Sequence, residues 1–309
     1  PECSAHASVA LQFPLSSAKK KAPASARELY LNFYWKPRQL NEWQQSVNDY
    51  VAAYDQYVVD LKRKFSNVEV KAKSLRINGN IIENEQMKVV ISPESGCPVN
   101  WQYNGTERLT SPVKISLFRP LTDNDNRDRQ VGKIWVKEGL NNITQKVKDW
   151  HITKQNKNVK VTSEIEILNA NNKNIAHATL EFLIHVDGSM EVNGIIVPDT
   201  TQLSQFARVG ITFGMPETYQ KVVYNGRGPW ESYIDRDRNG MIGLYKTTVP
   251  EMFVYYVNPQ STANRTDVRW ISLAGENGVG MKVSSDKTFQ FSVSPYTDDN
   301  IEEATHINQ

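Results

Sequence analysis

Residues 178–186 read ATLEFLIHV, and an apolar side chain stands at every second position from Ala178 to Val186. A period of two is typical of a β-strand that buries one face. The same alternation recurs at residues 29–35, 113–117 and 159–167. The sequence therefore predicts a protein built mainly of β-strands.

Short turn signals separate these strands. Asn78-Gly79, Asn104-Gly105 and Asp187-Gly188 are dipeptides that favour tight β-hairpins. Further strand-like stretches, VRWISL from Val268 and FQFSVSPY from Phe289, follow near the end. The strand–helix alternation of a nucleotide-binding sheet is absent from the pattern. The arrangement favours an all-β fold of antiparallel sandwiches.

Three segments depart from the strand pattern. In residues 40–61, apolar side chains recur at helical spacing, although the second half is rich in β-favouring Tyr and Val. Residues 14–27, PLSSAKKKAPASAR, are predicted to be a loop with solvated lysines. Residues 297–308 begin with Thr and Asp, which predicts a short helix.

Composition narrows the class of protein. The 309 residues include 36 basic and 34 acidic side chains, and this near-neutral balance argues against nucleic-acid binding as the main purpose. A hydrophobic fraction of 39% supports a packed core and excludes a disordered chain. No apolar run reaches the roughly 18 residues of a membrane span. We expect no membrane association.

The length suggests two domains, or one large β domain and a fragment. We expect the boundary at the polar segment 62–67, KRKFSN, which gives domains 1–65 and 66–309. The sequence starts PECSAHASVALQF, without an initiator Met or a signal-peptide pattern. It reads as a chain entered in its middle, so a cytoplasmic or a periplasmic location stays open.

Cysteine and histidine usage argues against metal and disulfide frameworks. Cys3 and Cys97 are too few for a disulfide scaffold or a Cys-rich metal site, and a single bridge between them stays open. The five histidines show no metal-ligand spacing. Phosphate-loop, nucleophile-elbow and zinc-protease motifs are absent. We expect neither a cofactor nor a metal.

The carboxylate pattern does not assign a catalytic residue. Glu164 and Glu166 lie two apart on one strand, and a carboxylate pair performs glycoside hydrolysis, but a solvated strand face is the preferred interpretation. Asp123, Asn124 and Asp125 lie in LTDNDNRD, which superficially resembles a calcium loop. The glycine expected at the sixth position is Asp128. A turn held by side-chain hydrogen bonds is preferred; saccharide-facing and metal-binding roles remain alternatives.

The densest polar and aromatic cluster is YNGRGPWESYIDR at 224–236, where Gly226, Gly228 and Pro229 predict a rigid turn. Planar donors, carboxylates and aromatic rings are the groups that bind sugars. An internal Arg–carboxylate network that ties the loop to a sheet is the preferred interpretation, and sugar binding is the alternative. In such a network Arg227 can bridge a carboxylate such as Glu231 or Asp235, and a mixed role is expected for Arg227 and Glu231. Asp235 and Arg236 are adjacent, so we expect each to pair across the loop in a structural role.

Several of these stretches resemble signatures of the family 2 glycoside hydrolases. RPLTDND at 119–125 is similar to the R-A-P-T-D-N-D signature of their large β-galactosidases, with departures at Pro120 and Leu121. YNGRGPWESYIDR resembles the G-x-G-P-x-E-x-Y-x-D-R signature. FARVGITFGMP at 206–216, NRTDVRWISL at 264–273 and ATH at 304–306 resemble further stretches in the same order. Together they resemble the β-galactosidase small-chain domain.

This resemblance implies a more specific fold. Residues 66–309 should form a large antiparallel super-sandwich, similar to galactose mutarotases and truncated at its C-terminus. RELYLNFYW and VAAYDQYVVDL resemble the closing strands of the preceding immunoglobulin-like domain. Residues 50–61 are therefore expected to be a strand despite their helical spacing, whereas residues 40–48 stay open.

The resemblance also implies a function. The chain should be the non-catalytic C-terminal region of a β-galactosidase that hydrolyses terminal β-galactosides. It should pack on a catalytic barrel of the same polypeptide or of a large subunit and help to shape the sugar site. The family's catalytic glutamates lie in that barrel, which this sequence lacks. The family's domain also continues beyond the Thr-His signature to a tryptophan that reaches the active site, and Trp230 and Trp270 are not its equivalents.

We expect a galactoside or another glycan as the ligand, no nucleic acid, and leave a homo-oligomer open. The alternatives are a stand-alone carbohydrate-binding module and a sugar epimerase-like protein. The candidate carbohydrate-binding residues are Arg119, Asp123, Asn124, Asp125, Arg227, Trp230, Glu231, Tyr233, Asp235, Arg236, Arg269, Trp270 and His306.

Overall fold

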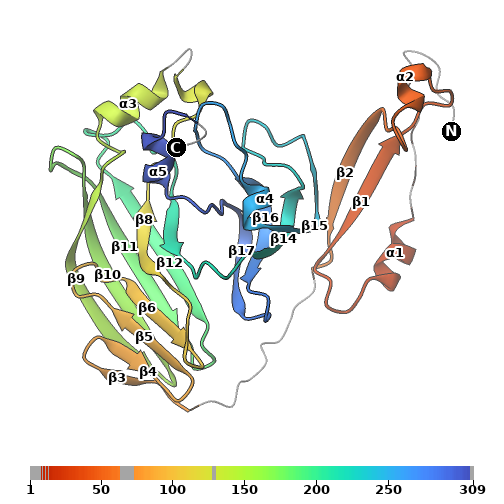
Figure 1. Cartoon of the computed structure of the whole chain (residues 1–309). Coiled ribbons are helices and arrows are strands. Elements are labelled where there is room, and N and C mark those ends of the chain that lie inside the picture. Colours follow the sequence, from red (N-terminus) through yellow and green to blue (C-terminus); the bar gives the residue numbers. More distant parts are fainter. Residues whose placement is uncertain are drawn as a thin grey trace. The chain divides into compact units, whose positions relative to one another are not determined.

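A computed structural model describes residues 14–62, 73–126 and 130–306, together with Ser8, Ala10 and Gln12. The described chain is mostly β, with antiparallel sheets and a few short helices (Figure 1). It divides into two compact units. The first contains Pro1–Val68 with Met241–Gly243, and the second contains Glu69–Gly240 with Leu244–Gln309.

The first unit contains a two-stranded antiparallel sheet. β1 (Glu28–Trp35) pairs with β2 (Ala53–Asp60) over its whole length. The strand expected in residues 50–61 is thus confirmed for Ala53–Asp60. Part of the segment 40–48, which the sequence left open, is helical and forms α2 (Glu42–Gln45). The helix begins with a capping box, in which the side chains of Asn41 and Gln44 each accept the backbone N–H of the other.

The loop expected for residues 14–27 is wrong in part, because Leu15–Lys21 form the helix α1. This segment, LSSAKKK, contains no Gly or Pro, and its Ala and Lys are good helix formers. Three lysines in the last turn also favour the negative end of the helix dipole. The lysines are exposed, as expected.

The second unit begins with a meander in which β3–β7 pair in sequence order. A four-stranded sheet follows, in the order β12-β11-β10-β9, and β8 pairs with β13. The strands are β3 (Arg76–Asn78), β4 (Ile81–Glu83), β5 (Met87–Ile91), β6 (Pro98–Tyr103), β7 (Thr106–Glu107), β8 (Ser111–Ser116), β9 (Thr144–Gln155), β10 (Asn158–Leu168), β11 (Asn174–Ile184), β12 (Met190–Pro198) and β13 (Gly210–Gly214).

A second four-stranded sheet, in the order β15-β14-β16-β17, carries the C-terminal part (Figure 1). Its strands are β14 (Lys221–Gly228), β15 (Met241–Thr248), β16 (Arg265–Ala274) and β17 (Gly280–Phe291). The short helices of this unit are η1 (Asp123–Asn126), α3 (Val131–Lys137), α4 (Val249–Met252) and α5 (Asp298–Glu303). α5 confirms the helix expected near the end of the chain.

The core follows the alternation of the sequence. In β10, Val159, Val161, Ile165 and Ile167 are buried, while Glu164 between them is exposed on the other face. β11 likewise buries its alternate apolar side chains from Ala178 to Ile184. The predicted period of two is confirmed, and so is the solvated position of Glu164.

The three predicted hairpin turns are present. Gly79, Asn104, Gly105 and Gly188 all have positive φ angles, which glycine and asparagine adopt most readily. Gly188 also lies so close to the Tyr103 ring that an added Cβ would be 2.3 Å from it. These turns connect β3 to β4, β6 to β7 and β11 to β12.

Cys97 is a free thiol buried in the larger core cluster. The open question of a bridge to Cys3 lies outside the described residues, as does most of the expected boundary segment 62–67. Across the residues that the structure describes, every helix is too short or too polar to serve as a membrane span.

Candidate functional site

The acidic turn after β8 is held by Asp125. Its carboxylate accepts two hydrogen bonds from Arg119, with Nη1–Oδ2 at 2.7 Å and Nη2–Oδ1 at 3.1 Å. It also accepts the Thr122 backbone N–H at 2.7 Å and the Thr122 hydroxyl at 2.8 Å. Arg119 in turn lies over the Trp135 ring, 5.6 Å from its centroid. The interpretation as a turn held by side chains is confirmed for Asp125.

The environment of Asp125 favours its charged form. Burial alone would raise the pKa, but the hydrogen bonds from Arg119 and Thr122, together with the Arg119 charge, lower the pKa of Asp125 below its ordinary value. Asp125 is therefore ionised and paired at neutral pH.

Asp123 has a different role from the one expected. It is exposed, and its backbone N–H donates to Gln260 Oε1 at 3.2 Å. The Gln260 amide nitrogen lies 3.5 Å from the Asp123 carboxylate. The turn is thereby connected to the segment around Gln260. Among the described residues, no three His, Cys, Asp or Glu side chains gather closely enough to hold a metal ion.

Arg227 belongs to an internal Arg–carboxylate network, as expected, but its partner is neither Glu231 nor Asp235. Its Nη2 and Nε donate to Asp267 Oδ2 at 2.6 and 2.8 Å, and its Nη1 donates to the Gly240 carbonyl at 2.9 Å. The reason is that Arg227 still belongs to β14, which pairs with β16. The side chain therefore pairs with a carboxylate of the neighbouring strand, and its third contact is with the end of its own loop, at Gly240.

Glu231 is the centre of a buried polar network. Its carboxylate accepts hydrogen bonds from Arg236, from the Tyr256 hydroxyl, from Thr262 Oγ1 at 3.3 Å and from the Ala263 backbone N–H at 3.3 Å. Burial, and then the hydrogen bond to Glu231, raise the pKa of Tyr256. The network fixes the loop after β14 to the segment that follows α4.

Arg236 pairs across its loop with Glu231, which confirms the arrangement expected for it. Asp235 is exposed and has no side-chain hydrogen bond within the described part of the chain, so its expected structural pairing is wrong. The Tyr233 hydroxyl, two residues before Asp235, is buried. Burial, and then the nearby Glu231 charge, raise the pKa of Tyr233 to about 12, and a side-chain hydrogen bond with Ser261 lowers it by a smaller amount.

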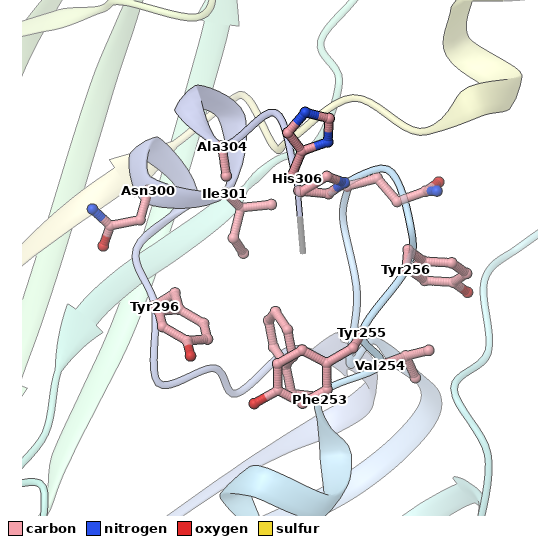
Figure 2. Close-up of a pocket in the computed structure, with 11 residues that line it drawn as sticks. Phe253, Val254, Tyr255, Tyr256, Tyr296, Asn300, Ile301, Ala304 and His306 are labelled. Carbon is pink, nitrogen blue, oxygen red and sulfur yellow. The ribbon is translucent and has the colours of Figure 1, made fainter. Parts of the chain in front are cut away.

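An aromatic hollow lies beside this network. We use this name for the space lined by Phe253, Val254, Tyr255, Tyr256, Pro259, Gln260, Tyr296, Asn300, Ile301, Ala304 and His306. Its empty volume is about 500 Å³, including solvent at the mouth. Figure 2 shows Phe253 and Tyr255 on one side, with Ile301 of α5 and Ala304, the residue after that helix, facing them from the other. The hollow is therefore formed by two chain segments, one that precedes β16 and one that follows β17.

The other candidate residues do not converge on one point. Trp230 and Asn124 are exposed. Arg269 donates to the Asp267 carbonyl at 2.5 Å, and the Lys282 ammonium lies 4.7 Å from the Trp270 ring centroid. Only His306 directly lines the aromatic hollow. Asp123 and Glu231 contact the hollow's Gln260 and Tyr256, as given above.

Sequence reasoning missed the aromatic residues of the hollow. Phe253, Tyr255 and Tyr256 belong to one run, FVYY, and Tyr296 lies forty residues further along. The dense aromatic run was a signal that could have been used. Its partner could not be found from spacing, because the contact depends on the path of β16 and β17.

Most of the chain is similar to known β-galactosidases and to one protein family. Residues 83–309 match the model of the family described as "Beta galactosidase small chain". The chain is 26% identical to a β-galactosidase of Priestia megaterium over 84% of this chain and 25% of that protein. It is 25% identical to a β-galactosidase of Halalkalibacterium halodurans over 92% of this chain and 30% of that protein.

A β-galactosidase of Vibrio cholerae is 28% identical over 70% of this chain and 21% of that protein. The chain thus spans about a quarter of the length of these curated relatives. The family model covers most of the second compact unit, including both loops described above. The chain belongs to the β-galactosidase small-chain family.

Proposed function

We propose that this chain is the non-catalytic C-terminal region of a β-galactosidase that hydrolyses terminal β-galactosides. The observation that carries the proposal is the small-chain match over residues 83–309, combined with coverage of only a quarter of each relative. Retaining hydrolysis requires two carboxyl groups on opposite sides of the glycosidic bond. In this proposal, those groups belong to the catalytic barrel outside this chain.

The finer fold is part of the same proposal. Residues 66–309 form a super-sandwich of the galactose mutarotase type, and residues 1–65 supply closing strands of an immunoglobulin-like domain. A two-stranded sheet is marginal by itself in water. The β1–β2 sheet also leaves Trp35 and Tyr57 exposed, which supports completion of this sheet by further strands.

The second unit offers a candidate surface for packing on the barrel. Ile234 and Val257 are both 86% exposed, and Trp230 is exposed nearby in sequence. The Glu231–Tyr256 hydrogen bond connects the loops that carry them. Neighbouring exposed apolar side chains on fixed loops are typical of an interaction surface. We place the contact with the barrel at these loop tips.

The experiment compares the isolated chain with the longer polypeptide encoded in the same reading frame. The purified chain should not hydrolyse o-nitrophenyl β-galactoside, whereas the longer polypeptide should. Removing residues 69–309 from the longer polypeptide should abolish or strongly reduce turnover. Hydrolysis that persists at homogeneity and is proportional to the concentration of the isolated chain would falsify the proposal.

A further inference from the structure

We propose that the aromatic hollow is a non-catalytic carbohydrate-binding subsite that takes a pyranose ring. Phe253, Tyr255 and Tyr296 supply the apolar wall, and Gln260, Asn300 and His306 supply polar groups around it. This inference goes beyond the proposed function, because it assigns a ligand to the chain itself. It does not depend on hydrolysis by the rest of the protein.

The aromatic wall is already assembled. Phe253 meets Tyr255 with ring centroids 4.9 Å apart and an interplanar angle of 68°. It meets Tyr296 at 5.2 Å and 66°. Such edge-to-face contacts are favourable because the positive ring edge meets the negative ring face. Phe253 therefore holds the two tyrosines in defined orientations.

The two tyrosines nevertheless remain open to solvent. Tyr255 is 54% exposed and Tyr296 is 46% exposed. Their hydroxyls interact, and Tyr296 raises the pKa of Tyr255. One face of a pyranose carries several C–H groups with a slight positive charge, which suits the negative face of an aromatic ring. Stacking there would bury ring surface that the chain leaves exposed.

Polar groups around the hollow match the hydroxyls of a sugar. Asn300 accepts the Thr297 backbone N–H through Oδ1 at 3.2 Å, which fixes its position beside the hollow. Gln260 is fixed by Asp123, and Figure 2 places the His306 imidazole at the rim. A purely apolar ligand would make no use of these groups. A pyranoside presents both an apolar face and hydroxyls.

The walls are braced from outside. On one wall, the Tyr256 hydroxyl is bound to Glu231, and the Val254 N–H donates to Thr262 Oγ1 at 3.0 Å. On the other wall, α5 is held by the ion pair between Asp298 and Arg208. Glu302 of α5 also accepts the Leu121 N–H at 3.1 Å. A preformed site loses little conformational freedom when a ligand binds.

The hollow is suited to holding a sugar and not to cleaving it. None of its lining residues is Asp or Glu, and glycoside hydrolysis requires a pair of such groups. The proposed ligand is therefore a pyranoside that leaves unchanged.

The test is a titration of the isolated chain with methyl β-galactopyranoside, followed by NMR. We expect saturable shifts of the Tyr255 and Tyr296 ring signals. Galactitol, an open-chain polyol without a ring, should not produce saturable shifts. Tyr255→Ala and Tyr296→Ala should each weaken binding about tenfold or more, a loss of about 1.4 kcal/mol. Tyr255→Phe keeps the ring and should retain most of the affinity.

The matched control is Tyr57→Ala, because Tyr57 is 62% exposed and belongs to the β1–β2 sheet. Its binding curve should equal that of the parent chain. The ring-signal shifts of the unaltered protein keep the test decisive if an alanine variant does not fold. The proposal is overturned by an absence of saturation at about 100 mM, where a 10 mM site would be about nine-tenths full. It is also overturned by equal binding of galactitol, or by binding that shifts neither tyrosine. Each of these three failures would leave hydrolysis by the longer polypeptide unaffected.

Discussion

Arg227 donates two hydrogen bonds to one oxygen of Asp267, from Nη2 at 2.6 Å and from Nε at 2.8 Å. Asp267 has a φ angle of 53°, a left-handed conformation that is uncommon for a residue other than glycine. The register of β16 against β17 shifts at this point, between Arg265 and Val268. The ion pair therefore stabilises an irregular position of a central strand.

Arg227→Ala should lower the free energy of unfolding by about 1–3 kcal/mol, because it leaves the Asp267 carboxylate and the Gly240 carbonyl without this donor. The pair is partly exposed, so the loss should fall below that of a fully buried pair. Urea denaturation measures the change. Arg238→Ala, at a highly exposed arginine, is the matched control and should change stability by no more than about 0.5 kcal/mol. Equal midpoints for both variants would contradict the structural role of Arg227.

Two neighbouring residues should respond differently to substitution. Arg236→Met removes a charged donor from the buried Glu231 and should cost about 1–2 kcal/mol, since three other donors remain. Asp235→Asn alters an exposed side chain and should stay within about 0.5 kcal/mol of the parent. Thermal melts of both variants test the contrast. A larger loss for Asp235→Asn than for Arg236→Met would reverse the assignment.

The loop tips proposed to contact the barrel can be tested in the longer polypeptide. Ile234→Asp and Val257→Asp place charges on two highly exposed positions, so the stability of the isolated chain should change by no more than about 0.5 kcal/mol. In the longer polypeptide, the same changes should reduce hydrolysis or weaken association, because a buried unpaired charge is costly. Ile195→Asp, on the exposed face of β12, is the control. Full activity of the loop-tip variants would place the contact elsewhere.

The strands were predictable because burial of one face imposes a period of two on the sequence. Val159 to Ile167 and Ala178 to Ile184 show this period and are buried as expected. α1 was missed because SSAKKK has no apolar stripe, and its helix depends on local propensity. Helical spacing in residues 40–61 was misleading for Ala53–Asp60, which pair along β1. Strand pairing there overrides the local pattern.

The site was less predictable, because its contacts join residues far apart in the chain. The sequence grouped Arg227 with Glu231 and Asp235, but the partner Asp267 is reached only through the pairing of β14 with β16. The turn held by Asp125 was indicated by the density of Asp and Asn in one stretch, but its pairing with Arg119 was not predicted. Phe253 and Tyr255 are close in sequence, but Tyr296 contacts Phe253 only because β16 and β17 lie between them and bring the chain back to the same place.

Burial predicts that Cys97 is chemically inert in the folded chain. Its exposed fraction is 1%, and burial raises the pKa of its thiol to about 11. Because the thiolate is the reactive form, native protein should react with iodoacetamide only as fast as the core opens. A Cys3→Ser background isolates this thiol, and mass spectrometry counts the alkylated groups. Rapid labelling of the native variant would contradict the packing around Cys97.

The free energy of unfolding should depend on pH through the ionisation of the Asp125 carboxyl group. Arg119 and Thr122 outweigh the effect of burial and lower the pKa of Asp125 below 3.8, its ordinary value. In the unfolded chain, the pKa of the same carboxyl group returns to its ordinary value. At a pH between the folded and the unfolded pKa, the unfolded state therefore binds more protons than the folded state. Stability from this group is therefore complete above the unfolded pKa and is lost as the pH falls through the folded pKa.

Asp125→Asn should cost about 1–3 kcal/mol at neutral pH, because the amide removes the charge that Arg119 binds. The difference between parent and variant should be constant above about pH 5 and should shrink below about pH 4. Chemical denaturation at a series of pH values measures it. Asn124→Ala, in the same turn, changes no titrating group, so its difference from the parent should not vary with pH. A cost of Asp125→Asn that stays constant down to pH 2 would show that the charge of Asp125 does not stabilise the turn.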